Sequence, residues 1–522
     1  MITKTLARAA AALVVAAAVL ALVSTLSAQG RQAPPPEYNE LVAASKIVDP
    51  AVRLREFERI KAAFPETRFM EAIDASIMQA KVELSGSLEA VLALQADFMA
   101  KGRGSSRLLN PSTMAVQLVN HPNILAFDPQ GVLKAVLDYR AQARKAAADE
   151  ASFEGVPAEQ RDDLKTYALS AVELVAARAY LSAGDLPKAK TSLDAYRQAG
   201  GATGGNFQYV AAGLAEKQGR NAEALDLYLS AAVEEYMDAA DRAKALYARI
   251  NGKSDGFEAA LAAKAKALPF HPEPFKAPAG WKGKAVLAEL FTGSECPPCV
   301  GADLAFDALV ETFPAKYLAV LVYHLPIPRP DPMMNPASEA RQKAYGVTST
   351  PTVVIDGTAK SLGGGARGAA EGKFGQFRST IEPLLGAEPG VALKVQASLA
   401  GNTVKLAFDH DKAVTGAEYL LALVQDEQEH KGGNGVEVHR MVVRDLRGVD
   451  PSGAKTAEFD LAASEKAADD YLTAFEKGYT RVPGFKWQVR RNAIARRGLK
   501  VVYFVQEKST GKVLNAVVAD VR

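Results

Sequence analysis

The chain of 522 residues has little cysteine, little histidine and little net charge, and each shortage excludes a class of protein. Two cysteines are too few for a disulfide framework, and with six scattered histidines and no second cysteine pair they leave little for a metal site. The formal net charge of +2 argues against a nucleic-acid-binding protein, because such proteins concentrate positive charge. We therefore expect no metal, no cofactor and no nucleic-acid partner.

The apolar segment near the N-terminus is short. Lys4 and Arg8 precede the apolar run at residues 9–23, which is shorter than the ~20 residues that a membrane-spanning helix needs. Small polar residues follow the run, and this order is typical of a secretory signal peptide. We expect residues 1–28 to be removed on export to the periplasm or the medium, which leaves no stable membrane span. An uncleaved membrane anchor is the alternative.

A helical region is predicted after a flexible, Pro-rich lead-in at residues 29–40. Residues 41–268 show helical apolar spacing, and within them GDLPKAKTSLDAY begins at Gly184 and GRNAEALDLYLSA begins at Gly219, 35 residues later. Each segment follows another helical one, so the predicted unit is a helix pair joined by a turn that begins with glycine. The spacing resembles that of tetratricopeptide repeats, which implies a groove for a partner protein. A helical array that only packs on the rest of the chain is the alternative.

The pattern changes after a Pro-rich linker at residues 269–283. The strand pattern at residues 284–293, the amphipathic segment 300–313 and the almost wholly apolar run 317–324 predict a strand, a helix and a second strand parallel to the first. The two cysteines are then placed where the first strand ends and the helix begins.

Short β-strands are predicted over residues 388–522, separated by turn-forming residues and interrupted by one helix. They favour an antiparallel sandwich that serves in packing or docking. The fold class expected is therefore multidomain: an all-α repeat region, an α/β domain at residues 284–387 and a mostly antiparallel β-sandwich at residues 388–522.

Cys296 and Cys299 close too short a loop to restrain much chain entropy, so a stabilising disulfide is a poor explanation for them. At the start of a helix, free N–H groups and the helix dipole favour a thiolate. We expect Cys296 to attack a disulfide, and Cys299, less accessible inside the helical turn, to resolve the mixed disulfide. Pro297 and Pro298 fit the first turn of a helix and hold the sulfurs in a fixed relation.

The cysteine motif has a second half in YGVTSTPTVVIDG, where Thr-Pro precedes a β-branched strand. Together the two halves resemble thioredoxin-like proteins over about residues 280–385, and the positions that match are Cys296, Pro297, Pro298, Cys299, Thr350 and Pro351. The resemblance implies a cis peptide bond before Pro351, which faces the cysteines and leaves the preceding backbone free to pair with a substrate peptide. The wider sequence is most similar to exported bacterial thioredoxin-like proteins related to an outer-membrane-protein family.

Several side chains near the motif are candidate neighbours. Glu295 stands where thioredoxins have an aromatic residue, and its charge disfavours the neighbouring thiolate. Glu289 is either a buried carboxylate that aids proton transfer or, as its spacing favours, a surface residue at the strand edge. His324 ends the second strand on the cysteines' edge of the sheet, as a site neighbour or as an ordinary hydrogen-bonded histidine. The loop after it is expected to offer Met333 and Met334 to a partner.

The function expected is an exported thiol–disulfide oxidoreductase that acts on protein thiols or disulfides and exchanges electrons with a redox partner protein. In this interpretation the helical repeats recruit or orient the substrates. The alternative is a binding or scaffold protein in which Cys296 and Cys299 form a permanent disulfide.

Overall fold

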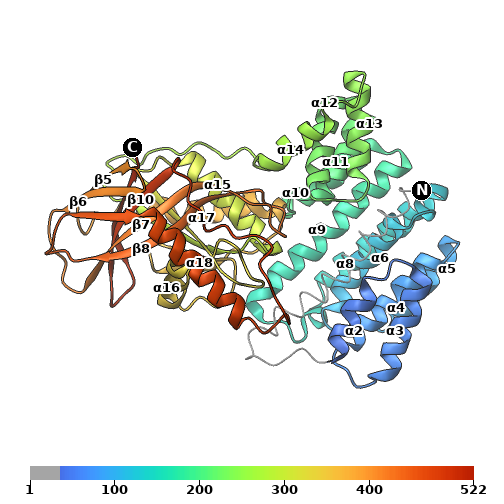
Figure 1. Cartoon of the computed structure of the whole chain (residues 1–522). Helices are drawn as coiled ribbons and strands as arrows, with labels where there is room; N and C mark the ends of the chain where they lie inside the picture. The colour runs from blue at the N-terminus through green and yellow to red at the C-terminus, as the bar shows by residue number, and fades with distance from the viewer. Residues whose placement is uncertain (1–35) are drawn as a thin grey trace. The chain divides into compact units, whose positions relative to one another are not determined.

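The computed structural model describes residues 36–522, and the chain divides into two compact units, Met1–Leu261 and Ala262–Arg522 (Figure 1). The predicted signal peptide lies outside the described residues, as does most of the predicted lead-in. Residues 36–40, expected as flexible, instead form the start of helix α2 (Pro36–Ser45). Between residues 36 and 522, no helix is long and apolar enough to cross a membrane.

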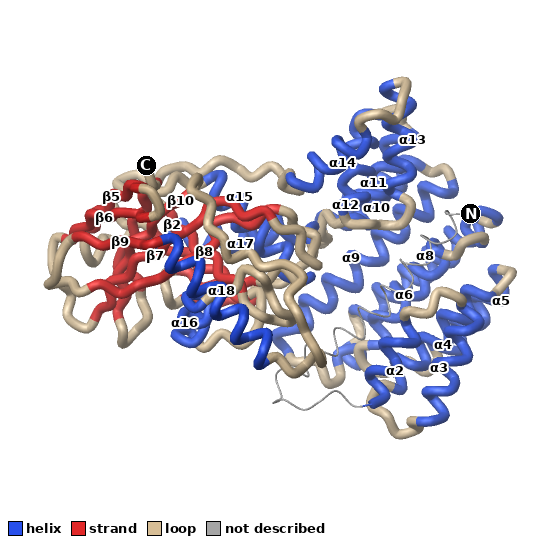
Figure 2. Tube along the Cα trace, in the orientation of Figure 1, coloured by secondary structure: helices blue, strands red, loops and turns tan. Residues whose placement is uncertain are grey.

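The first unit consists of helices that pack on one another in chain order, and Figure 2 shows no strand in its described part. After α2 come α3 (Pro50–Ala63), α4 (Met70–Leu84), α5 (Leu88–Met99), α6 (Ser106–Asn120), α7 (Ile124–Phe127), α8 (Pro129–Ala147), the 3₁₀ turn η1 (Glu150–Phe153), α9 (Ala158–Ala183), α10 (Leu186–Gln198), α11 (Gly205–Lys217), α12 (Asn221–Val233), α13 (Ala239–Asn251) and α14 (Phe257–Lys266), which spans the boundary.

The two similar sequence segments form equivalent helices. α10 packs on α9, and α12 packs on α11. The turns between them contain Gly184 with φ of 86° and Gly219 with φ of 77°, a backbone region that favours glycine. Ala189 of α10 and Ala224 of α12 are both fully buried. The helix pair predicted for each segment is confirmed.

The second unit is organised by an eight-stranded sheet with the order β11-β10-β7-β8-β2-β1-β3-β4, beside a three-stranded sheet with the order β5-β6-β9. The strands are β1 (Val286–Thr292), β2 (Leu318–His324), β3 (Thr352–Ile355), β4 (Ala359–Leu362), β5 (Leu393–Ala400), β6 (Thr403–His410), β7 (Ala417–Glu429), β8 (Val438–Val449), β9 (Thr456–Asp460), β10 (Leu499–Glu507) and β11 (Val513–Asp520). The chain is thus multidomain, with an N-terminal helical unit and a C-terminal unit whose sheet is mostly antiparallel.

Helices cover both faces of β1. The helical elements of this unit are the 3₁₀ turn η2 (Pro297–Cys299), α15 (Val300–Thr312), α16 (Pro336–Tyr345), the 3₁₀ turn η3 (Arg367–Ala369), α17 (Ala370–Leu384) and α18 (Leu461–Gly478). Thr292 of β1 bonds Asp303 of α15, whereas Glu289 bonds Arg341 of α16. Because alternate strand residues point to opposite faces, α15 and α16 lie on opposite sides of the sheet.

The predicted strand–helix–strand unit is confirmed, because β1 and β2 pair in parallel from Val286 with Leu318 to Thr292 with His324. α15 connects the two strands. Both strands are buried along their whole length, which agrees with the almost wholly apolar sequence of β2.

Residues 284–387 and 388–522, expected as two domains, contribute strands to one sheet. β8 pairs in parallel with β2 through Val442 and Val322, and one hydrophobic core contains residues of both segments, among them Phe306 of α15 and Phe504 of β10. The three-stranded sheet packs its apolar face on β7 and β10. Only this part of the unit is a sheet-on-sheet layer, as predicted for a sandwich.

The predicted linker at residues 269–283 lies on the second unit. The Phe275 ring stacks on Phe313 with 4.4 Å between centroids, and Trp281 lies 4.6 Å from Tyr317. These aromatic contacts hold the segment against the sheet's helical cover.

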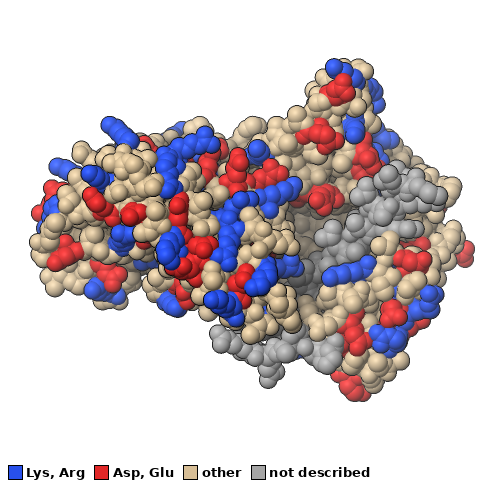
Figure 3. All heavy atoms as spheres, in the orientation of Figure 1, with Lys and Arg blue, Asp and Glu red and all other residues tan. Residues whose placement is uncertain are grey.

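On the face that Figure 3 shows, basic and acidic side chains are interspersed.

Candidate functional site

The two cysteines form a disulfide directly after β1, at the start of α15. Pro297 and Pro298 occupy η2, the 3₁₀ turn between the sulfurs, and α15 begins one residue after Cys299. Both prolines are exposed. The strand end and helix start predicted for the motif therefore meet at the disulfide.

Both cysteines are buried, with 0% exposure for Cys296 and for Cys299. The difference in accessibility expected between them is absent in the disulfide form. Thr350 lies against Cys296, with its hydroxyl oxygen 3.4 Å and its carbonyl oxygen 3.8 Å from Sγ. The Thr350 hydroxyl donates to the carbonyl of Ile327 at 2.7 Å. The peptide bond between Thr350 and Pro351 is cis, as predicted.

A glycine-rich loop after β4 encloses the motif from a second side. The N–H of Gly365 donates to the carbonyl of Pro298 at 2.7 Å, and the N–H of Gly301 donates to the carbonyl of Gly365 at 2.9 Å. A Cβ atom on Gly364 would make ordinary van der Waals contacts with Pro298 and Pro351. This loop was not among the site elements predicted from the sequence, although three consecutive glycines at residues 363–365 are typical of a close backbone approach.

The loop that joins β7 to β8, residues 430–437 and here called the hairpin loop, holds the chain just before Cys296. The backbone N–H of Asn434 donates to the carbonyl of Ser294 at 2.9 Å, and its side-chain amide lies 3.4 Å from the carbonyl of Gly293. The N–H of Gly433 donates to Oε1 of Glu295 at 2.9 Å. Glu295, predicted as a neighbour of the thiolate, is therefore bound to a segment far along the chain.

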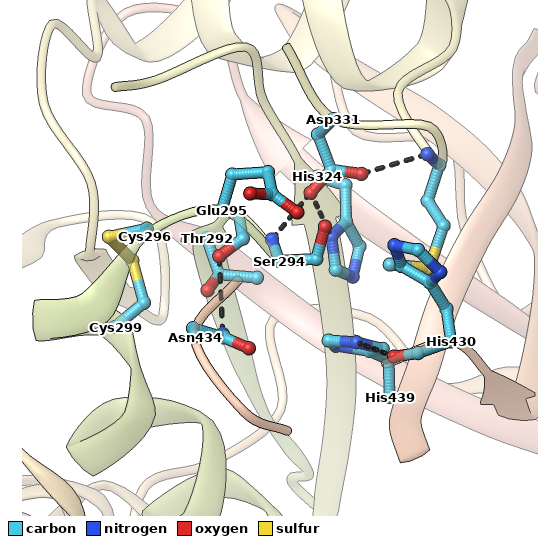
Figure 4. Close-up of polar contacts among 12 residues, drawn as sticks. Thr292, Ser294, Glu295, Cys296, Cys299, His324, Asp331, His430, Asn434 and His439 are labelled. Atoms are coloured by element: carbon cyan, nitrogen blue, oxygen red, sulfur yellow. Dashed lines mark hydrogen bonds and ion pairs between the residues drawn. A yellow bond between two sulfur atoms is a disulfide. The ribbon is translucent and has the colours of Figure 1, made fainter. Parts of the chain in front are cut away.

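Asp331 connects His324 to residues 294–300, here called the disulfide segment (Figure 4). Its Oδ2 lies 2.9 Å from Nδ1 of His324 and accepts the N–H of Ser294 at 2.5 Å, while Oδ1 accepts the N–H of Met333 at 2.8 Å. Burial alone would raise the pKa of Asp331, but His324 and the two N–H groups outweigh burial and lower the pKa to about 2. His324 thus supports the chain before Cys296 through Asp331.

The ring of His324 lies in a group with two other histidine rings, those of His439 and His430. The His439 ring centroid is 5.0 Å from that of His324 and 6.2 Å from that of His430. Burial lowers the pKa of His439 to about 3 and also lowers the pKa of His430. Among residues 36–522, no group of three or more His, Cys, Asp or Glu side chains could hold a metal ion.

Ser294, His324 and Asp331 are the residue types of a hydrolase triad, but their geometry is different. Ser294 Oγ and His324 Nε2 are both buried without a hydrogen-bond partner. A triad requires a bond between these two atoms, because the histidine activates the serine through it. The cluster is therefore a buried support for the disulfide segment.

Asp303 lies in the first turn of α15, one turn after Cys299. Its Oδ1 accepts the hydroxyl of Thr292 at 2.6 Å, and Asn434 Nδ2 lies 3.5 Å from its Oδ2. Burial raises the pKa of Asp303 to about 7. The carboxyl group is therefore partly protonated near neutral pH, and it lies between the end of β1 and the hairpin loop.

Glu289 is not the surface residue that its spacing predicted. It has 0% exposure, and its carboxylate accepts Nε of Arg341 at 2.7 Å and the hydroxyl of Tyr345 at 2.5 Å. It faces α16, on the opposite side of β1 from α15. The prediction was wrong because the strand pattern did not show that α16 covers this face.

Met333 and Met334 do not offer the partner contact that was predicted, since each has an exposure of 1%. Asp331 and Asn335 fold the loop back onto the sheet, where Asn335 donates to the carbonyl of Val443 of β8 at 2.8 Å. The exposed part of the loop is instead at Pro328 and Arg329.

The helical unit has an open groove of about 760 Å³ between α5 and α8. Half-buried apolar side chains line it, including Leu88, Leu92 and Met99 of α5. The exposed side chains of Lys134 and Asp138 of α8 add charges of both signs.

Comparison with protein-family models, with curated proteins and with solved structures found no match to this chain. The chemistry assigned to the site therefore rests on its geometry.

Proposed function

We propose that residues 284–387 form a thioredoxin-like redox centre and that the protein is an exported thiol–disulfide oxidoreductase. The observation that supports this most is the backbone of Thr350 lying against the Cys296 sulfur, with the carbonyl oxygen at 3.8 Å. Thr350 is half-buried, beside the exposed residues Pro297, Pro298 and Gly364. An extended substrate peptide has main-chain partners beside the sulfur at this point.

The reaction is a pair of thiol–disulfide exchanges. A substrate thiolate attacks Sγ of Cys296, the bond to Cys299 breaks, and Cys299 leaves as a thiolate that takes up a proton. The second substrate thiolate then attacks the substrate sulfur of the mixed disulfide and releases Cys296, which also takes up a proton. Two electrons pass from the substrate dithiol to the protein disulfide, and the same steps in reverse reduce a substrate disulfide.

A redox partner protein with a dithiol or a disulfide returns the centre to its starting state. In this proposal the helical unit is a repeat region that recruits substrate proteins to the redox centre. The groove between α5 and α8 supports this role, because it combines apolar side chains with charges of both signs and has the volume for side chains of a partner.

The second candidate function is a scaffold protein with a permanent disulfide. The complete burial of both sulfurs favours it, because an attacking thiolate must reach the sulfur it displaces. In the redox proposal, Thr350 or the loops around the disulfide must move before exchange.

The reduction potential of the purified protein separates the two candidates. We expect a value within roughly −270 to −120 mV, the range of catalytic dithiols, measured by equilibration in glutathione or dithiothreitol buffers and labelling of free thiols. A potential below about −300 mV is that of a structural disulfide. Such a value would reject the oxidoreductase and favour the scaffold.

A further inference from the structure

The hairpin loop binds the chain on both sides of the disulfide. Before Cys296 it bonds Ser294 through the N–H of Asn434 and Glu295 through the N–H of Gly433, each at 2.9 Å. After Cys299, its residue Val436 packs in a buried apolar cluster with Val300 and Leu304 of α15. A loop from β7 and β8 therefore restrains the start and the end of the disulfide segment together.

The tip of the hairpin loop lies very close to the chain just before Cys296. A Cβ atom on Gly432 would lie 2.3 Å from the carbonyl oxygen of Ser294, and one on Gly433 would lie 2.4 Å from Oε2 of Glu295. Neither glycine has a positive φ, so backbone conformation does not require glycine at these positions. The close approach to the Ser294 backbone requires glycine at residue 432, whereas at residue 433 the nearest atoms are the end of the flexible Glu295 side chain.

Bonds within the hairpin loop and one bond from β8 keep its tip in this position. The N–H of His430 donates to the carbonyl of Glu437 at 2.9 Å, and His439 Nε2 lies 3.0 Å from the carbonyl of His430. The side-chain oxygen of Asn434 accepts the N–H of Val436 at 3.0 Å. In Figure 4 the Glu295 side chain is turned away from the two sulfurs.

We propose that the hairpin loop is a clamp that stabilises the Cys296–Cys299 disulfide relative to the dithiol, with Gly433 and Asn434 as positioning residues. The disulfide and the clamp restrain the same stretch of chain. When one restraint is present, the other orders fewer degrees of freedom, so each favours the other. The inference rests on the proposed function only in requiring that the disulfide opens and closes.

The test uses the full chain and dithiothreitol, without any protein substrate. Reduction transfers two electrons and two protons from dithiothreitol to the two cysteines and leaves the cyclic disulfide of the reagent, so the ratio of oxidised to reduced protein gives an equilibrium constant. Gly432→Ala pushes the loop away from Ser294 without a change of charge. Gly448→Ala in β8 is the matched control, because a Cβ there meets nothing within 4 Å.

We expect Gly432→Ala to lower the equilibrium constant for disulfide formation about tenfold, which is about 30 mV for this two-electron couple. Gly433→Ala displaces only the flexible side chain of Glu295, so we expect a smaller fall of about threefold, and this variant replaces the first if Gly432→Ala does not fold. Gly448→Ala should match the wild type. If both variants match the control, or if either strengthens the disulfide, the clamp is refuted.

The free energies of unfolding of the oxidised and reduced forms distinguish a clamp from a merely structural contact. Gly432→Ala should lower the free energy of unfolding of the oxidised form more than that of the reduced form. The difference between the two losses should correspond to the measured change in the equilibrium constant for disulfide formation. Equal destabilisation of both forms would refute the proposal. Because no substrate takes part, a protein that fails to exchange disulfides with other proteins can still pass or fail this test.

Discussion

The buried ion pair between Glu289 and Arg341 gives a quantitative test of the fold. Arg341 donates to both carboxylate oxygens of Glu289, at 2.7 and 2.9 Å, and Tyr345 and Tyr323 donate to the same group. Glu289→Ala leaves the Arg341 charge buried without its partner. Removal of one member of a buried pair costs about 3–5 kcal/mol, so we expect the free energy of unfolding of the second unit to fall by that amount.

Tryptophan fluorescence during urea unfolding measures this change in the second unit alone, because the chain's two tryptophans, Trp281 and Trp487, both belong to it. Glu388→Ala is the control. Glu388 pairs with Lys282 at the same 2.7 Å, but its side chain is 72% exposed, so its loss should cost less than about 1 kcal/mol. If the two variants differ by less than about 1 kcal/mol, the buried position of Glu289 is wrong.

Two further predictions concern the pH dependence and the packing of the second unit. Asp303 has a folded-state pKa of about 7, above the ordinary 3.8, so the folded state keeps a proton that the unfolded chain loses. The contribution of Asp303 to stability should therefore fall by up to about 1.4 kcal/mol per pH unit between about pH 4 and 7. Because the lowered pKa of His439 acts in the opposite direction, we expect this fall in the difference in unfolding free energy between the wild type and Asp303→Asn, measured by urea titration at each pH. Gly357→Ala places a Cβ 1.9 Å from the carbonyl oxygen of Gly511, whereas Gly346, also with a positive φ, has nothing within 4 Å; Gly357→Ala should lower the melting temperature clearly more than Gly346→Ala, and equal effects would contradict the close approach of the two turns.

Local patterns predicted the centre of the site correctly. The strand pattern of β1, the almost wholly apolar run of β2 and the amphipathic segment between them predict a parallel strand–helix–strand unit, which the structure has, because burial on both faces leaves a direct record in the sequence. The same patterns placed Cys296 at the junction of strand and helix. The paired helices around Gly184 and Gly219 were predicted for the same reason, since their spacing is local.

Long-range pairing is what the sequence could not predict. The bond between Gly433 and Glu295 joins residues 138 positions apart, and the KGGNG segment alone indicates only a turn. The pairing of β8 with β2 depends on how two buried strands from different segments meet. Burial of Glu289 depends in turn on α16 covering one face of β1. None of these features leaves a periodic signal, so they follow only from the assembled sheet.

Mixed-disulfide trapping by Cys299→Ser is the decisive test of whether Cys296 and Cys299 exchange disulfides with other proteins. This variant keeps the attacking thiol but lacks the thiol that releases the partner. We predict that mixed disulfides through Cys296 accumulate, are seen by non-reducing electrophoresis and are identified by mass spectrometry, whereas Cys296→Ser traps far fewer. If neither variant forms adducts while both are folded and exported, the oxidoreductase proposal is contradicted.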